Sequence, residues 1–297
     1  MNQPLLTVFT PTYNRAHTLG RLYKSLQAQT SKNFEWLIID DGSTDNTVEI
    51  VKPWLNETQF VVRYVYKENG GLHTGYNAAI EMLRTELAVC IDSDDYMPGN
   101  AVELIEKCWI TRGSSNYAGI VGLDYDTNGN MIGGLWSNQE SINLIDMSLG
   151  KLGVKNGDKK NVVRTDLYKT VAPMKVFPGE KNFNPHWMHL EISRQYDFIP
   201  LNECLCIVDY QSDGMTASMF KQYYNSPNSF LEIRKQFFSF GSAPLSIELR
   251  NMVHLNSSAL LAHRWISEFT ISNRKLKMLI CQPAGLALSI ITRIKGR

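Results

Sequence analysis

Short apolar runs alternate along the first third of the chain with segments whose apolar residues recur every three or four positions. The apolar runs that we predict as strands are 5–10, 35–40, 60–66 and 87–91. The segments that we predict as helices are 17–29, 45–55, 76–83 and 99–111. Strands that alternate with helices indicate βαβ units, so we expect an α/β fold with a mainly parallel central sheet flanked by helices.

The second half of the chain has a less regular pattern. Segment 122–136 contains Asn128-Gly129, a strong signal for a hairpin turn, and 140–160 is predicted to be a loop. We expect further strands at 161–164 and 198–209 and a helix at 186–196. From 219 onward the apolar spacing is helical, which predicts an appended C-terminal helical region.

The chain ends in a basic and apolar tail. Its basic residues are Arg274, Lys275, Lys277, Arg293, Lys295 and Arg297. Pro283 and Gly285 are expected to interrupt any long helix there, and no apolar run reaches the roughly 20 residues of a membrane span. The tail is therefore interpreted as an interfacial membrane anchor or as a terminal helix packed on its domain. No secretory signal pattern is visible at the N-terminus.

Each predicted strand of the first third ends in a polar cluster. These clusters are 10–14, 40–43, 69–73 and 92–95. Because the carboxyl ends of parallel strands meet at one edge of a sheet, we expect all four clusters to open onto the same edge. Ligands of open α/β sheets bind at that edge.

Asp92, Asp94 and Asp95 follow the fourth predicted strand without interruption. Three carboxylates at the end of a buried strand cost folding free energy unless a cation compensates them. Hard oxygen ligands suit Mg²⁺ or Mn²⁺, which usually complete their coordination with water and substrate phosphates. The alternative is a solvated acidic turn, because short motifs of this kind often occur by chance.

The other clusters suit a nucleotide. The carboxylate of Asp41 can accept the imide N–H of a uracil ring, and Gly70-Gly71 leaves backbone amides bare near a ligand. Neither the P-loop pattern nor the glycine fingerprint of dinucleotide-binding proteins occurs. We therefore expect metal and carboxylates to hold the nucleotide.

Composition narrows the class of protein. The 297 residues are 43% apolar and 20% charged, with a net charge of +1, so a general field for nucleic acid is not expected. The five cysteines lie mostly in apolar runs, which is typical of a reducing compartment. Cys204-x-Cys206 has no second pair of ligands to complete a zinc site.

Five motifs in residues 5–123 together resemble family-2 glycosyltransferases with the GT-A fold. They are Thr10-Pro-Thr-Tyr-Asn14, Leu26-x-x-Gln-Thr30, Ile38-Ile-Asp-Asp-Gly-Ser-Thr-Asp45, Asn69-Gly-Gly-x-x-x-x-x-Asn77 and Asp92-Ser-Asp-Asp95. The resemblance implies an inverting transfer, dependent on Mn²⁺ or Mg²⁺, of a sugar from a nucleoside diphosphate. Relatives often carry a basic residue where this chain has Leu72, so neutralisation of the diphosphate is left to the metal, His73 or Lys67.

The resemblance also assigns site residues. Those implied to bind the nucleotide are Thr10, Pro11, Tyr13, Asp41, Asn69, Gly70, Gly71, His73, Asn77, Asp92 and Ser93. Asp94 and Asp95 are implied to face the metal and diphosphate. His186, one helical turn before His189, is a further candidate metal ligand, although a lone histidine is more often packed or capping.

An inverting transfer needs a base for the acceptor hydroxyl. The family places an acidic residue 80–90 positions beyond the Asp-x-Asp motif, and Glu180 fits that position. Relatives often have Glu-Asp there, whereas this chain has Glu180-Lys181. Glu191 is therefore an alternative base and Asp197 a weaker one. A surface carboxylate without catalytic role is the remaining interpretation of Glu180.

These inferences predict three regions. Residues 1–123 form a nucleotide-sugar-binding half, 124–218 an acceptor-binding and catalytic half, and 219–297 the helical region. The predicted function is transfer of a sugar from a nucleoside diphosphate donor, for which we expect a UDP-sugar. The expected acceptor is a glycan or a lipid-linked intermediate of a surface polysaccharide, at the cytoplasmic face of the membrane. A sugar-1-phosphate nucleotidyltransferase and a non-catalytic nucleotide-sugar-binding module are the alternatives.

Overall fold

The structure, a computed structural model, describes residues 3–136, 139–154, 157–211, 218–264 and 274–296. The chain divides into two compact units. The first comprises 1–144, 154–174 and 188–210, and the second comprises 145–153, 175–187 and 211–297. Each is described by itself.

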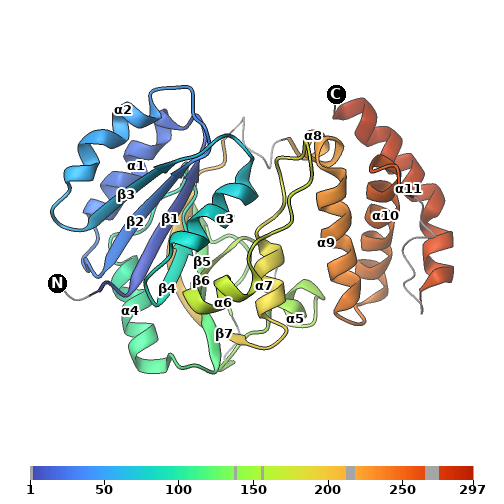
Figure 1. Ribbon diagram of the computed structural model, residues 1–297. Coiled ribbons are helices and arrows are strands. Elements are labelled where there is room, and N and C mark those ends of the chain that lie inside the picture. Colours follow the sequence, from blue (N-terminus) through green and yellow to red (C-terminus); the bar gives the residue numbers. More distant parts are fainter. Residues whose placement is uncertain (1–2, 137–138, 155–156, 212–217, 265–273, 297) are drawn as a thin grey trace. The chain divides into compact units, whose positions relative to one another are not determined.

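The first unit is built on a seven-stranded sheet (Figure 1). Its strands are β1 (Leu6–Thr12), β2 (Phe34–Asp40), β3 (Val61–Tyr66), β4 (Leu87–Cys90), β5 (Tyr117–Asp126), β6 (Lys159–Arg164) and β7 (Asp197–Val208). The strand order is β3-β2-β1-β4-β6-β5-β7, and β6 is antiparallel to both of its neighbours while the other pairs are parallel. The predicted α/β fold with a mainly parallel sheet is confirmed.

Helices connect these strands. They are α1 (Ala16–Gln27), α2 (Thr47–Val51), the 3₁₀ helix η1 (Lys52–Asn56), α3 (Leu72–Met82), α4 (Ala101–Arg112) and α6 (Thr165–Val171). The helix expected over 45–55 is split after Val51, because Pro53 lies at the start of η1 and cannot donate a hydrogen bond within an α-helix. Two short helices, α5 (Leu144–Ser148) and α7 (His186–Ile192), cross the boundaries between the units.

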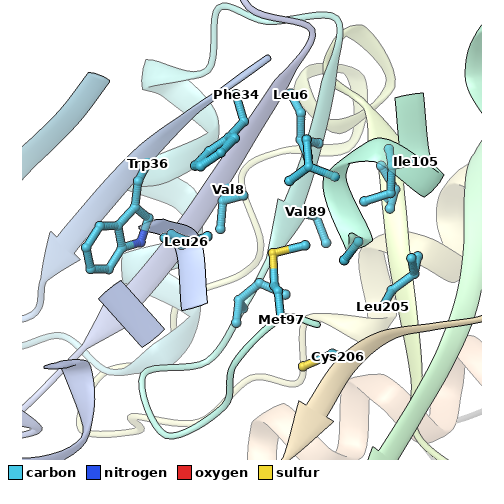
Figure 2. Close-up of a cluster of buried hydrophobic side chains, with 14 of the residues drawn as sticks. Leu6, Val8, Leu26, Phe34, Trp36, Val89, Met97, Ile105, Leu205 and Cys206 are labelled. Carbon is cyan, nitrogen blue, oxygen red and sulfur yellow. The ribbon is translucent and has the colours of Figure 1, made fainter. Parts of the chain in front are cut away.

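The core of the first unit explains why its strands are continuous apolar runs. Every residue of β1 and β2 is buried, as expected for central parallel strands covered on both faces. Figure 2 shows Leu6 and Val8 of β1 beside Phe34 of β2, Leu26 of α1 and Ile105 of α4. The buried stripe of α1 has the three-and-four spacing that predicted this helix.

Parallel pairing brings the four polar clusters to one edge, as predicted. Thr12 at the end of β1 pairs with Asp40 at the end of β2, and Asp40 pairs with Tyr66 at the end of β3. On the other side of β1, Phe9 pairs with Cys90 at the end of β4. The chain turns to opposite sides of β1 to form β2 and β4, which makes β1 and β4 flank the switch point where such sheets bind ligands.

The hairpin predicted over 122–136 forms only in part. β5 runs through Asp126, whose carboxylate accepts the backbone N–H groups of Asn128 (2.9 Å) and Asn130 (2.8 Å) and so makes the expected tight turn. Beyond the turn, a single antiparallel bridge joins Tyr125 and Met131. The return strand is then lost, since β6 already occupies the adjacent edge of β5.

The second unit is helical. Its helices are α8 (Met219–Asn225), α9 (Pro227–Ser239), α10 (Leu245–Leu261) and α11 (Lys275–Lys295). Phe237 and Phe238 of α9 pack with Met252 and Leu255 of α10 and with Met278 of α11.

The expectation that Pro283 and Gly285 interrupt the tail is wrong. Both lie inside α11, which continues for 21 residues. A proline inside a helix removes one hydrogen bond, and packing against α10 compensates for that loss here. Among the described residues, α11 is the one helix long and apolar enough to cross a membrane, a test that core helices of soluble proteins also pass.

Candidate active site

Asp41 is a buried anchor for the loops at the ligand edge of the sheet. Its carboxylate accepts the backbone N–H groups of Gly70 (3.0 Å) and Gly71 (2.7 Å) and pairs with the ammonium of Lys67. The side-chain amide of Asn69 donates to the Asp41 carbonyl at 2.7 Å and to Oδ2 at 3.1 Å. The loop after β3 is therefore fastened to the loop after β2 by several charge-assisted hydrogen bonds.

Two residues with positive φ complete this assembly. Gly42 has φ of 84°, and a Cβ there would lie 2.8 Å from the backbone nitrogen of Asn69. Asn14 has φ of 53°; its N–H donates to Ser43 Oγ at 2.9 Å, and its Oδ1 accepts the N–H of Thr44 at 2.8 Å. Asn and Gly are the residues that adopt such conformations most readily. The loops after β1, β2 and β3 are thus bound into one structure.

The three carboxylates after β4 differ in exposure. Asp92 is exposed, Asp94 is partly buried and Asp95 is buried. Burial and the neighbouring Asp92 raise the pKa of Asp94 above its usual value. The guanidinium groups of Arg15 and Arg21 act in the opposite direction. Asp92 and Asp94 are therefore the two carboxylates that solvent, and with it a ligand, can reach.

Asp95 points into the protein and holds the acidic loop to the end of β7. Its Oδ1 accepts the backbone N–H of Asp209 at 3.1 Å, and Cys206 Sγ lies 3.8 Å from Oδ2. Next to it, Tyr96 and Ile207 exchange two backbone hydrogen bonds of 3.1 and 2.7 Å. Burial raises the pKa of Asp95 to about 7. The metal role predicted for Asp95 stays a prediction, and Asp94 is the more accessible of the two.

Arg21 of α1 braces the same loop from another side. Its Nη1 lies 2.6 Å from Oδ2 of Asp209, and its Nη2 donates to the carbonyl of Asp94. The guanidinium also lies over the ring of Tyr96, 4.9 Å from the centroid. Three interactions from one side chain thus fix the backbone that carries Asp94.

A buried ion pair lies beneath the acidic loop. Lys160 of β6 and Asp124 of β5 have side chains only 12% and 2% exposed, with 3.9 Å between Nζ and Oδ2. Burial would lower the pKa of Lys160, but its acidic neighbours, led by Asp124 and including Asp95 and Asp92, raise it well above its usual value. Lys160 therefore supplies a fixed positive charge to a region rich in carboxylates.

Several residues predicted to contact nucleotide have side chains directed inward. Thr10 Oγ1 accepts the indole N–H of Trp36 at 3.0 Å. The amide of Asn77 bonds the backbone N–H and carbonyl of Met174 at 2.8 and 3.0 Å. The side chain of His73 is fully buried. These three side chains support the loops from within.

Other predicted members are better placed for a ligand. Tyr13 is 47% exposed and Asp92 is also exposed at the same edge. Pro11 and Ser93 are buried, so they would meet a ligand through the backbone if at all. Lys67, one candidate for neutralising the diphosphate, already has partners in the protein. Its ammonium pairs with Asp41 and donates to Thr74 Oγ1 at 2.8 Å.

Glu180, in the second unit, is engaged by the start of α9. Its carboxylate accepts the backbone N–H and side-chain amide of Asn228, both at 2.8 Å, and the backbone N–H and hydroxyl of Ser229, at 2.8 and 2.7 Å. Four donors use all the lone-pair sites that a carboxylate offers. A carboxylate at a helix N-terminus is also stabilised by the helix dipole. This environment is that of a structural cap on α9.

The two alternative carboxylates belong to the first unit and are less enclosed. Glu191 pairs with Arg194, with 2.7 Å between Oε2 and Nε. Asp197 accepts hydrogen bonds from the hydroxyl of Ser141 at 2.8 Å and the amide of Asn143 at 2.9 Å. Of the three candidates, Glu191 has the partner that moves most easily, because a partly exposed ion pair is worth little.

The two histidines of α7 have different surroundings. The ring of His189 lies between the hydroxyl of Tyr168 at 2.9 Å and the side-chain amide of Asn161 at 3.2 Å, so it is a packed histidine. His186, which belongs to the second unit, has Nε2 3.4 Å from Ser148 Oγ. Its role as a metal ligand stays a prediction.

The donor set fits a divalent cation held jointly with a phosphate. Within the described ranges, no three His, Cys, Asp or Glu side chains are arranged to hold a metal by themselves. Mg²⁺ and Mn²⁺ sites of phosphoryl substrates need only one or two carboxylates, with oxygens of the substrate completing the shell. Asp94, which is partly exposed and has a raised pKa, is suited to be one of these carboxylate ligands.

The most informative residues that the sequence analysis missed are charged side chains. Arg15 directly follows the Thr10–Asn14 motif, so extending that motif by one residue would have found the cation that acts on Asp94. Arg21 lies on the polar side of a correctly predicted helix and carried no signal of its own. Lys160 and Asp124 lie 36 residues apart, and only strand pairing brings them together.

Comparison with known proteins identifies the family to which the chain belongs. The sequence pattern of glycosyl transferase family 2 matches residues 7–156, which is half of the chain. The chain belongs to this family. A chondroitin synthase of Pasteurella multocida (strain Pm70) and a hyaluronan synthase of Pasteurella multocida are each 39% identical over 105 residues, 35% of this chain and 11% of each relative. The chain thus spans about a tenth of these relatives.

Solved structures extend the likeness in fold to almost the whole chain. TarS of S. aureus (residues 1–349) in complex with UDP-GlcNAc superposes with a TM-score of 0.63 at 17% identity, over 98% of this chain and 88% of that one. The mannosyltransferase PcManGT from Pyrobaculum calidifontis, in complex with GDP-Man and Mn²⁺, gives a TM-score of 0.56 at 16% identity, over 100% and 88%. At these identities the likeness establishes the GT-A fold alone.

Proposed function

We propose that this glycosyltransferase moves a sugar from a nucleoside diphosphate donor, UDP in the first instance, to a hydroxyl of a glycan or lipid-linked acceptor in surface polysaccharide synthesis. The observation that carries the proposal is the meeting of Asp41, Asp92 and Asp94 at one edge of a parallel sheet, next to its switch point. Membership of the glycosyl transferases argues against the nucleotidyltransferase alternative. The relatives named as synthases of chondroitin and hyaluronan support a polysaccharide product.

Within this proposal, the loops bind and orient the donor. The exposed ring of Tyr13 offers a surface on which a base can stack. Because Asp41 already accepts several donors, its part is to hold the backbone amides of Gly70 and Gly71 in place, and a uracil would have to share its carboxylate. Asp92, which is exposed at this edge of the sheet, would accept hydrogen bonds from the donor's hydroxyl groups.

The residues that would hold Mn²⁺ or Mg²⁺ are Asp94 first, with Asp95 as a further candidate. When bound, the cation offsets negative charge on the leaving diphosphate. Arg15 and Arg21 add positive charge on the protein side, since both already act on Asp94. These two cations would compensate for Leu72, which occupies a position where relatives often carry a basic residue.

The reaction proposed is a single displacement with inversion. A carboxylate takes the proton of the acceptor hydroxyl while the hydroxyl oxygen attacks the anomeric carbon of the donor sugar. The bond between that carbon and the diphosphate breaks. Between the two candidates, we favour Glu191, because Glu180 would have to give up a hydrogen bond that caps α9 before it could accept a proton.

The proposal is tested by incubating the purified protein with a panel of UDP-, GDP- and other nucleotide sugars, with and without Mn²⁺, and measuring release of nucleoside diphosphate. We expect release from one donor class, dependent on a divalent cation and lost in Asp94→Ala while the circular dichroism spectrum is unchanged. Asp146→Ala, which removes a partly exposed carboxylate paired with Lys151, is the control and should stay active. Normal turnover by Asp94→Ala would refute the metal role.

For a lipid-linked acceptor, the proposed location of the enzyme is the cytoplasmic face of the cell membrane. The basic and apolar C-terminal helix supports this location.

A further inference from the structure

Apart from Met278, the C-terminal helix α11 has small or polar residues at its buried positions, while most of its large apolar residues are exposed. Its buried positions are Met278, Cys281, Gly285, Ser289 and Thr292. These positions recur every three or four residues and form the face that packs on α10. An ordinary surface helix of a soluble protein has the opposite arrangement, with its large apolar side chains turned toward the core.

Close approach of the two helices explains the small inner residues. A Cβ at Gly285 would lie 2.4 Å from Cβ of Asn256 and 3.2 Å from the carbonyl oxygen of Val253. The side-chain amide of Asn256 donates to the carbonyl of Met278 at 3.1 Å. The inner face of α11 is therefore fixed to α10, and this packing determines which residues of α11 form its outer face.

That outer face is the main exposed apolar surface of the described chain. Seven of its 17 exposed large hydrophobic side chains lie on this one helix. They are Leu276, Leu279, Ile280, Leu286, Ile290, Ile291 and Ile294. Leaving so many apolar side chains together in water is costly, and such patches mark a binding surface.

Basic residues flank this face on both sides. Lys275 and Arg293 are 18 residues apart, about five turns, so they share one flank of the helix. Lys277 and Lys295 have the same separation and share the other flank. Residues 274–297 contain no Asp or Glu, and within the described residues Arg274 and Lys277 both pair with Glu248 of α10. An apolar strip between two lines of cations is complementary to an anionic lipid surface.

We propose that the outer face of α11 docks in the plane of an anionic phospholipid bilayer, with its isoleucine and leucine side chains in the acyl boundary and its lysine and arginine side chains at the headgroups. This deepens the proposed location by naming the contact surface. A spanning arrangement is disfavoured because α10, to which α11 is fixed, carries Glu248, Arg250 and His254, and these would enter the hydrocarbon.

The first test is flotation of the full-length protein with phosphatidylcholine vesicles that contain either no phosphatidylglycerol or about one third of it. We expect binding to the anionic vesicles and at least tenfold weaker partitioning for Ile280→Asp combined with Ile294→Asp. Ile110→Asp, on the exposed side of α4, is the matched control because that side chain is 72% exposed, and it should bind like wild type. Equal binding by all three proteins would overturn the proposal.

The second test concerns charge. Lys275→Glu combined with Arg293→Glu should reduce binding to anionic vesicles by more than tenfold, since each cation near such a surface contributes about 1 kcal/mol, or about fivefold. Lys24→Glu combined with Lys52→Glu, two exposed lysines of α1 and η1, should not reduce it. No effect of the first pair would refute the headgroup contact.

The remaining outcomes identify other occupants. If wild type is a dimer by light scattering, fails to bind vesicles, and becomes a monomer in Ile280→Asp with Ile294→Asp, the face joins two copies and the proposal is wrong. Resistance of the bound protein to extraction by alkaline carbonate would indicate a spanning helix and would also overturn it. Release of nucleoside diphosphate from a soluble donor should be unchanged in the α11 variants, so failure of docking and failure of the proposed reaction give different results.

Discussion

The backbone N–H of Asp209 donates to Oδ1 of Asp95 at 3.1 Å, and Arg21 closes the same contact by pairing with the side chain of Asp209 at 2.6 Å. The carboxylate of Asp95, the last residue of the acidic motif, therefore already accepts a hydrogen bond from the protein backbone. One consequence is a division of labour, in which Asp95 fixes the loop and Asp94 faces solvent on a braced backbone.

Removing the brace should affect catalysis more than folding. We expect Arg21→Gln to lower kcat/KM for the donor by about tenfold or more, because the backbone of Asp94 loses a hydrogen bond and the ring of Tyr96 loses its cation. The measurement is steady-state kinetics with thermal unfolding in parallel. Lys24→Gln, on the exposed side of the same helix, is the control. Unchanged kcat/KM in Arg21→Gln would contradict a positioning role.

The raised pKa values of Asp94 and Asp95 predict a dependence of stability on pH. Both carboxyls hold their protons to higher pH in the folded protein than in the unfolded chain, where Asp titrates near 3.9. The folded state therefore binds more protons between about pH 4 and 7, and its stability falls as pH rises through that window.

A divalent cation should reverse this loss. Because Mn²⁺ binds the ionised carboxylates and not the protonated ones, we expect it to raise the melting temperature clearly at pH 8 and little at pH 5. Differential scanning fluorimetry at both pH values measures the effect, and Asp94→Asn should remove most of it. An equal rise at both pH values would show that Mn²⁺ acts elsewhere.

Glutamine substitutions should separate the two candidate bases. Glu180→Gln cannot accept four donors with a full charge, so it should weaken the start of α9 and cost about 1–2 kcal/mol of stability. Glu191→Gln should leave stability nearly unchanged and abolish turnover while donor binding persists. The comparison requires urea unfolding and kcat for both variants. A stable and inactive Glu180→Gln beside an active Glu191→Gln would return the base to Glu180.

Lys160 and Asp124 should be coupled in stability. Replacing Lys160 with Met leaves the carboxylate of Asp124 buried without its cation, which typically costs 3–5 kcal/mol for such a pair. Combining it with Asp124→Leu should recover much of that loss, because no uncompensated charge remains. Urea unfolding of the four proteins in a double-mutant cycle measures the coupling. Additive losses would mean that the two side chains act independently.

The fold could be predicted from the sequence because the first four strands are short apolar runs and each is followed by a helix with regular spacing. The edge at which the site lies followed from the parallel arrangement, and the structure confirms it through pairs such as Thr12 with Asp40. By contrast, the return strand of the hairpin and the break at Pro283 were predicted from local signals, and packing overrode both. Local turn and proline preferences are small beside tertiary contacts.

The candidate site was predicted in its residue types but not in the direction of its side chains. Asp41, Asn77 and Asp95 were expected to face a ligand, and each one also bonds the protein's own backbone. A carboxylate or amide at the end of a strand suits both uses, so the sequence could not separate them. The partner of Glu180, 48 residues further along the chain, was likewise beyond any local pattern.

The bonds that join Asn14 to Thr44 and Asp41 to Gly71 have a consequence for engineering. We expect that one of these segments cannot be replaced alone by that of a relative, because a foreign segment would lose its hydrogen-bond partners on the other two. A successful chimera would need to import all three segments as a set, together with Gly42, whose lack of a side chain allows them to meet.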